Sequence, residues 1–167
     1  MSQQFASDNN AGLCPEALEA LVQANGEGHA TGYGGDTWTE RACDRVRTLF
    51  ETDCAVFFVF SGTAANALAL AHICCPYHAV IAHAESHVAT DEAGAVGFFS
   101  GGAAVLTADT PLAKLTPAAV ERLATGGRGF HSVKPNALSL TQATEMGTLY
   151  ALDELRALTE LARRHRL

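Results

Sequence analysis

A continuous apolar segment that ends in three small residues constrains the fold of this chain most. The sequence CAVFFVFSGTAAN covers residues 54–66, and residues 55–60 within it contain no polar side chain. An apolar run without alternation predicts a strand that is buried on both faces of a parallel sheet. Ser61, Gly62 and Thr63 follow it, and the alanine-rich residues 64–73 predict a helix. We therefore expect the chain to pass from a core strand directly into a helix at this turn.

Such a turn suits an anionic ligand. It presents free backbone N–H groups and two hydroxyls at a helix N-terminus, which together bind a phosphate without any lysine. The GxxxxGK[ST] spacing of a P-loop is missing, and no GxGxxG follows the first strand. A Ser-Gly-Thr sequence alone is also typical of an ordinary turn. These residues therefore indicate a phosphorylated small molecule, and a generic α/β phosphate-binding domain for a nucleotide stays open.

Helix and strand patterns alternate along the rest of the chain. Pro15 begins a helix that stops near Gly26, Asp36 or Thr37 caps the next one, and further helices are predicted at 64–73, 116–123 and 153–164. Strands are predicted at 55–60, 79–82, 104–107 and 137–141. This alternation predicts an α/β fold with a mostly parallel sheet and flanking helices. Ligands bind beyond the carboxyl ends of such strands, where we expect Ser61, Ser86 and residues 141–145.

The second helix carries an apolar pattern of its own. Its apolar residues recur at helical spacing, which predicts an inward-facing core stripe rather than a cofactor contact: Trp38, Ala42, Val46, Leu49 and Phe50.

Charge and composition exclude several classes of partner. The chain has 167 residues, 48% of them apolar, and a net charge of -7. Its only basic cluster is Arg163, Arg164 and Arg166, which fits a helix end, so neither nucleic acid nor a membrane surface is expected as a partner. No apolar run approaches the roughly 18 residues of a membrane helix. Five cysteines without a CxxC pair predict a reducing, cytoplasmic setting, and no metal site is expected.

Several segments together resemble one enzyme family. In order and spacing they are similar to the low-specificity L-threonine aldolases, which belong to the β-eliminating lyase group of enzymes dependent on pyridoxal 5′-phosphate. That group has the aspartate-aminotransferase type of fold. The resemblance runs from Phe5 to Leu167 in these segments: FASDNNAGLCPEALEAL, GHATGYGGDTWT, LFETDCAVFFVFSGTAANALAL, HAESHVATDEAGAVGFFSGG, AKLTP and SLTQATEMGTLY.

The resemblance implies roles for the cofactor-facing residues. Ser61, where threonine is commoner in the family, would bind the cofactor phosphate together with Gly62 and Thr63. His87 would lie flat against the pyridine ring. Glu92 falls on a family acidic position and would orient a proton transfer or a water; a carboxylate that only satisfies backbone N–H groups is the alternative.

The resemblance also implies contacts with a substrate. His131 would lie near the side-chain hydroxyl of the substrate and help to move its proton. Ser7 would help to hold the substrate carboxylate, and Tyr33 would reach the site of a neighbouring subunit. The implied reaction is retro-aldol cleavage of L-threonine, L-allo-threonine or a related β-hydroxy amino acid to glycine and an aldehyde. The implied assembly is a homodimer or homotetramer with sites between subunits.

The sequence departs from the family in one respect. An HxDGAR segment, which would supply an aspartate to the ring nitrogen and an arginine to the substrate, is not in the sequence, and neither Lys114 nor Lys134 lies in the context of the Schiff-base lysine. Both lysines are predicted to be surface residues. We expect a single, N-terminal portion of the large domain, with an arm and helix at 1–35 and the first half of the sheet domain at 36–167. A non-catalytic homologue that serves as an assembly or interaction module is the alternative.

Overall fold

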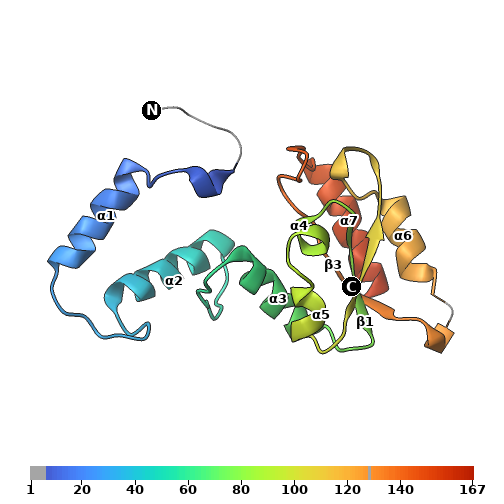
Figure 1. Cartoon of the computed structure of the whole chain (residues 1–167), viewed down its shortest axis with the longest axis horizontal. Coiled ribbons are helices and arrows are strands. Elements are labelled where there is room, and N and C mark those ends of the chain that lie inside the picture. Colours follow the sequence, from blue (N-terminus) through green and yellow to red (C-terminus); the bar gives the residue numbers. More distant parts are fainter. Residues whose placement is uncertain (1–6, 128) are drawn as a thin grey trace. The chain divides into compact units, whose positions relative to one another are not determined.

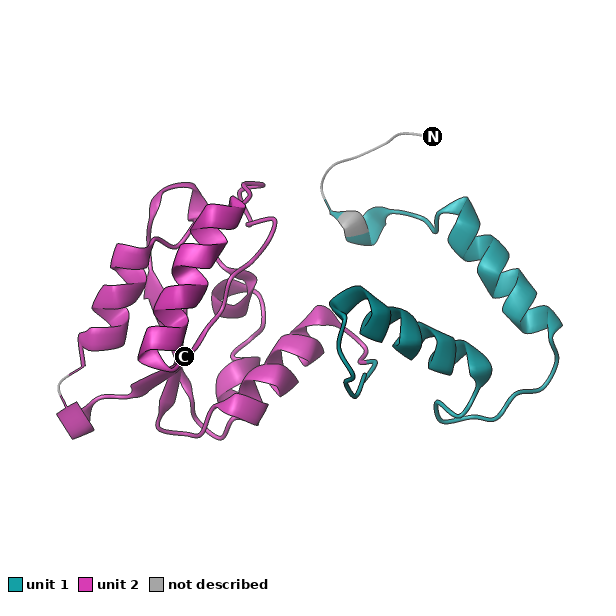
Figure 2. Ribbon diagram, turned by 180° about the vertical axis from the view of Figure 1, so that it is seen from behind, with its two compact units in different colours: residues 1–58 teal, residues 59–167 magenta. Residues whose placement is uncertain are grey.

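The computed structural model of the chain describes residues 7–127 and 129–167. Its contacts form two compact units, residues 1–58 and residues 59–167 (Figure 2). The division into units reflects which residues contact one another, and it does not test the domain organisation. The expectation of one domain with a boundary at residue 35 therefore stays a prediction.

The first unit is helical. It holds a short 3-10 turn, η1 (Asp8–Asn10), followed by α1 (Pro15–Gly26) and α2 (Thr37–Phe50). Pro15 opens α1 as predicted, because a first-turn residue needs no N–H partner. Asp36 is the N-cap of α2, with its Oδ1 accepting a hydrogen bond from the Thr39 N–H at 2.8 Å. Of the two predicted caps, Asp36 and Thr37, the helix therefore uses Asp36.

The predicted core stripe on α2 is wrong. None of the residues of α2 is buried, and Leu49 and Phe50 are 77% and 68% exposed. In the described part of this unit the only other regular elements are η1 and α1, so the unit itself contains no sheet. Helical spacing shows which side chains share a face, but it does not show what covers that face.

The second unit contains the sheet. In chain order it comprises α3 (Gly62–Ile73), β1 (His78–His83), α4 (His87–Thr90), α5 (Ala95–Phe99), β2 (Ala104–Ala108), η2 (Pro111–Ala113), α6 (Pro117–Thr125), η3 (Gly129–His131), β3 (Lys134–Leu138) and α7 (Leu152–His165) (Figure 1). The helices predicted at 64–73, 116–123 and 153–164 are confirmed to within two residues at each end. The fourth predicted strand begins three residues earlier than expected, at Lys134 instead of Ala137.

The sheet has the strand order β2-β1-β3, and both pairs are parallel, as predicted. Pro135 lies within β3, where it lacks an N–H for the ladder. It is tolerated because β3 is at an edge of this sheet. The register between β1 and β3 shifts after Ala79, so that Pro135 pairs with Ala79 and Ala137 with Val80. Asn136 is the extra residue of this bulge.

Two layers of helices cover the sheet. All six residues of β1 are buried, as expected for a central strand. Because successive side chains of a strand point to opposite faces, Ile81 packs with α6 and α7, whereas Val80 and Ala82 pack towards α3 and α5. The first cluster is Ile81, Ala108, Leu115, Ala119, Val120, Tyr150, Leu158 and Leu161. The second is Cys74, Val80, Ala82, Val88, Val96, Ala103 and Ala137.

The strand predicted at residues 55–60 is not formed. These residues have no regular secondary structure, and Phe57 and Phe60 are 83% and 103% exposed. A strand requires a neighbour for its N–H and C=O groups, and none of β1 to β3 pairs with this segment. The helix that follows it is nevertheless present, so the expected helix N-terminus survives this correction.

Tyr150 supports the loop before α6, and removing its hydroxyl is expected to destabilise the fold. The side chain is buried, which raises the pKa of its phenol, and its oxygen accepts a hydrogen bond from the Leu115 N–H at 2.6 Å. Tyr150→Phe leaves that buried N–H without an acceptor, so the free energy of unfolding should fall by about 1–3 kcal/mol. Urea denaturation measures this change. Tyr77→Phe is the control, because Tyr77 is 64% exposed and should change stability by less than about 0.5 kcal/mol. Equal losses of stability in Tyr150→Phe and Tyr77→Phe would contradict this role of the Tyr150 hydroxyl.

Candidate active site

The N-terminus of α3 is open to a ligand. Ser61 has extended backbone angles and caps the helix, with its Oγ accepting a hydrogen bond from the Ala64 N–H at 3.2 Å. In the part of the chain that the structure describes, the N–H groups of Gly62 and Thr63 have no acceptor. A Cβ built on Gly62 would meet no atom within 4 Å. The first turn of this 12-residue helix therefore directs free donors into open space, as an anion site requires.

A buried carboxylate joins α3 to the residues that follow β1. Oε1 of Glu92 lies 2.9 Å from Nδ1 of His87 and accepts a second hydrogen bond from Nδ2 of Asn66 at 2.6 Å. The Glu92 side chain is 0% exposed, and its Oε2 is buried without a partner among the described residues. Asn66 lies one helical turn after Gly62, so this bridge holds His87 beside the beginning of α3.

The charge of Glu92 acts on His87. The hydrogen bond to Glu92 raises the pKa of His87, partial burial of the imidazole opposes this, and the charges of Glu92, Glu145 and Asp91 add to the increase. The side chain of His87 is 45% exposed, so one part of the ring faces Glu92 and the rest is accessible. The site thus combines a flat, protonatable ring with an accessible face.

Glu92→Gln is expected to lower the pKa of His87 towards its ordinary value, because a neutral amide accepts the same hydrogen bond without favouring the imidazolium. A proton NMR titration of the ring measures this. Since the folded pKa lies above the unfolded one, the wild-type pair contributes stability that is fully present below pH 6.5 and is lost as the pH rises through the folded pKa. Glu121→Gln is the control, since Glu121 pairs with His165 instead. A His87 titration curve that is identical in Glu92→Gln and wild type would contradict the pairing.

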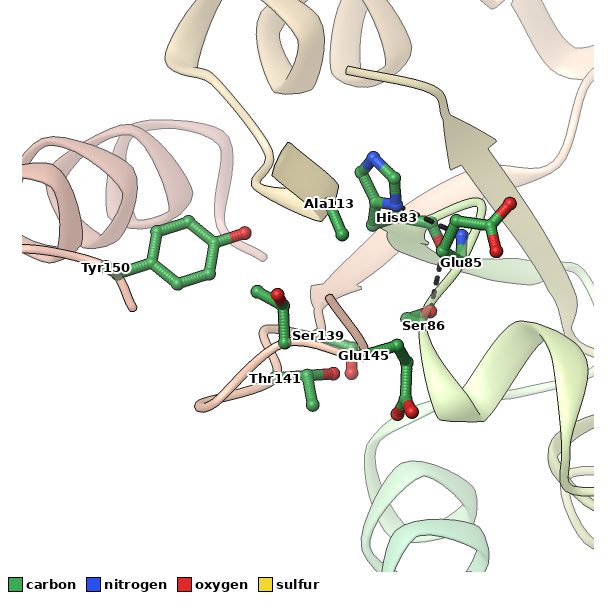
Figure 3. Close-up of a pocket in the computed structure, with 9 residues that line it drawn as sticks. His83, Glu85, Ser86, Ala113, Ser139, Thr141, Glu145 and Tyr150 are labelled. Atoms are coloured by element: carbon green, nitrogen blue, oxygen red, sulfur yellow. Dashed lines mark hydrogen bonds between the residues drawn. The ribbon is translucent and has the colours of Figure 1, made fainter. Parts of the chain in front are cut away.

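Polar side chains also gather where β1 and β3 end. Figure 3 shows this pocket, in which Ser86 donates a hydrogen bond to the carbonyl of His83 at 2.7 Å. Its volume is about 10 Å³, which is room for about one water. The lining residues are His83, Glu85, Ser86, Ala113, Ser139, Thr141, Thr144, Glu145 and Tyr150. The expected clustering of Ser86 with residues 141–145 is therefore confirmed, but Ser61 does not line this pocket.

Comparison with known proteins decides the family. Residues 4–167 match the beta-eliminating lyase family. The chain belongs to the beta-eliminating lyases. It is 54% identical over 158 residues to a low-specificity L-threonine aldolase of Pseudomonas aeruginosa, covering 95% of this chain and 45% of that protein. It is 53% identical to an enzyme of the same name from a Pseudomonas species, with the same coverage.

A solved structure shows the same fold. The threonine aldolase of Leishmania major superposes with a TM-score of 0.86 at 33% identity, over 95% of this chain and 46% of that one. The α/β fold expected from the sequence is thus confirmed. The chain spans about half the length of the curated beta-eliminating lyases that it matches.

The other predicted site residues lie elsewhere in this lyase chain. His131 is exposed and ends η3, just before the amino end of β3, whereas His87 follows the carboxyl end of β1. Because β1 and β3 are parallel, the two histidines lie towards opposite ends of the sheet. Ser7 and Tyr33 belong to the first unit, where the Ser7 Oγ accepts a hydrogen bond from the Asn9 N–H and Tyr33 is exposed. The roles of all three residues stay predictions.

Neither lysine lies at the open end of α3. Lys114 was predicted to be a surface residue, but its side chain is only 17% exposed, and its Nζ binds Oε2 of Glu154 at 2.6 Å. The ion pair and the Tyr150 ring beneath it cover this lysine. Lys134 is exposed, as predicted, and begins β3 at the amino end of the sheet.

Sequence reasoning missed Asn66, although a signal was present. It is the single amide in a run of small and apolar residues, and it follows Gly62 by one helical turn.

Among residues 7–127 and 129–167, no three His, Cys, Asp or Glu side chains are grouped as metal ligands would be. In the same part of the chain, no helix has the length and apolarity to cross a membrane.

Proposed function

We propose that this chain is part of a pyridoxal-phosphate-dependent carbon–carbon lyase that cleaves L-threonine, L-allo-threonine or a related β-hydroxy amino acid to glycine and an aldehyde. The observation that carries the proposal is the bridge from α3 through Asn66 and Glu92 to His87, which places an accessible imidazole beside an open helix N-terminus. The similarity to threonine aldolases supports the same activity.

The residues at the start of α3 fit the phosphate of this cofactor. The free N–H groups of Gly62 and Thr63 are donors to phosphate oxygens, and the positive end of the helix dipole favours their charge. The hydroxyls of Ser61 and Thr63 are further donors, since Ser61 uses only an oxygen lone pair in capping the helix. Gly62 leaves room for the phosphate because no atom lies within 4 Å of its Cβ position.

His87 and Glu92 carry the remaining roles that we assign to this unit. The accessible face of His87 contacts the pyridine ring, and Glu92 fixes the orientation of the imidazole. Glu92 thereby orients a proton transfer or a water at the accessible part of the imidazole, while its own Oε2 is buried without a partner among the described residues. When bound, the cofactor supplies the electron sink for breaking the Cα–Cβ bond.

The second unit does not place every predicted site residue beside His87. An assembly of several copies accounts for the others. We propose a homodimer or homotetramer in which sites lie between subunits, so that Tyr33 reaches the site of a neighbouring copy, His131 lies near the substrate hydroxyl and Ser7 binds the substrate carboxylate. We propose that the Schiff-base lysine and the residues of the HxDGAR segment lie in the half of the longer relatives that this chain does not match. A cytoplasmic location is proposed from the five cysteines, all of which are free thiols.

A chimaera tests the function. This chain replaces the matching half of the Pseudomonas aeruginosa relative, and the release of glycine and acetaldehyde from L-threonine is measured with pyridoxal phosphate present. We expect activity in the chimaera and a loss of at least about 100-fold in its His87→Ala variant. A folded chimaera without activity would support the non-catalytic alternative.

A further inference from the structure

The function proposed above uses the contact between Asn66 and Glu92 only as a link between α3 and His87, and it gives Asn66 no role of its own. Asn66 is an exposed residue of α3, yet its Nδ2 forms one of the shortest side-chain hydrogen bonds in the described structure, 2.6 Å to the buried Oε1 of Glu92. Hydrogen bonds from a neutral amide to a carboxylate are charge-assisted, and they are therefore shorter and stronger than those between neutral groups.

The bond determines how Glu92 is oriented. A carboxylate bonded only to His87 can vary the angle of its plane, because its terminal torsion has a broad minimum. Two donors that converge on one oxygen position, from Asn66 and His87, fix the plane of the carboxylate. They also leave Oε2 as the oxygen without a partner among the described residues.

We propose that Asn66 is a positioning residue: its amide holds Oε1 of Glu92 in place for His87 and ties the imidazole to the helix whose N-terminus is the phosphate site. Asn66 contacts neither cofactor nor substrate in this scheme and acts through Glu92. The proposal deepens the proposed function and rests on it for the role of His87. The contacts among Asn66, Glu92 and His87 are those of the chain without a ligand.

Replacement of Asn66 is expected to leave the fold intact. Because Asn66 is exposed on α3, Asn66→Ala removes little packing, and alanine favours a helix more than asparagine does. Asn66→Gln retains the amide donor on a longer side chain and serves as the conservative variant. The control is Asn136→Ala, because Nδ2 of Asn136 donates to the carbonyl of Ile73 at the other end of α3, also at 2.6 Å.

The readout is the titration of the His87 ring, followed by NMR on the 167-residue chain without any ligand and assigned with His87→Gln. The charged groups that act on this ring are Glu92, Glu145 and Asp91, and none of the three is altered in the variants. In Asn66→Ala we expect the pKa of His87 to fall towards its ordinary value, because Glu92 is no longer held against the imidazole. Asn66→Gln should restore at least part of the increase, and Asn136→Ala should leave it unchanged.

The possible outcomes separate the two proposals. An unchanged or higher pKa of His87 in Asn66→Ala would overturn the positioning role, and so would an equal decrease in Asn136→Ala, which would indicate general loosening of α3. Failure of Asn66→Gln to restore any of the increase would also count against it. Because no cofactor is present, these results do not depend on whether the chain binds pyridoxal phosphate.

Discussion

Replacing Gly62 with aspartate is expected to weaken the binding of a pyridoxal-type phosphate by about 100-fold or more. A carboxylate at this position meets the phosphate at close range, and two like charges about 4 Å apart repel by about 4 kcal/mol near a protein surface. The fold should tolerate the change, because Gly62 does not have a positive φ and its Cβ position is open. An acidic residue in the first turn even stabilises a helix, by about 0.3–1 kcal/mol.

The measurement uses pyridoxine 5′-phosphate, which has the ring and the phosphate but no aldehyde that reacts with lysine. Equilibrium dialysis compares its affinity for wild type, Gly62→Ala and Gly62→Asp. Gly62→Ala controls for the added Cβ and should reduce affinity far less than the aspartate. If the aspartate variant binds as well as wild type, the phosphate does not bind at the start of α3.

Leu158→Ala is expected to lower the free energy of unfolding by about 2–5 kcal/mol. Leu158 is 0% exposed and packs from α7 into the cluster that contains Ile81 and Val120. Its truncation leaves a cavity that the parallel sheet beneath it cannot fill. Leu152→Ala is the matched control on the same helix, because Leu152 is 69% exposed and should cost less than about 0.5 kcal/mol. Comparable urea midpoints for the two variants would show that α7 does not cover this face.

The sequence predicted the second unit well because its signals are local. The strands at 79–82 and 104–107 and the helices around them follow from unbroken apolar runs, first-turn prolines and capping residues, none of which needs a distant partner. Residues 55–60 carried an equally strong strand signal, but a strand exists only where another strand meets it. The prediction of a core stripe from Trp38 to Phe50 was wrong for the same reason. Helical spacing shows which side chains share a face, but it does not show which part of the protein packs against that face.

The candidate site was predictable to a similar degree. Ser61, Gly62 and Thr63 were found from the break in the apolar run, and His87 and Glu92 from resemblance. The contact between Glu92 and Asn66 joins residues 26 positions apart, so no local pattern shows it. The position of His131 at the other end of the sheet depends on the parallel pairing of β1 and β3, which the sequence suggested only in outline.

The amide NMR spectrum of the chain, recorded with pyridoxine 5′-phosphate and separately with pyridoxine, tests the central claim most directly. The account predicts that the phosphorylated compound shifts the N–H signals of Gly62, Thr63 and Ala64 together with the ring signals of His87, and that pyridoxine leaves the three amides almost unchanged. Equal shifts with both compounds, or shifts confined to other residues, would contradict a phosphate site at the start of α3.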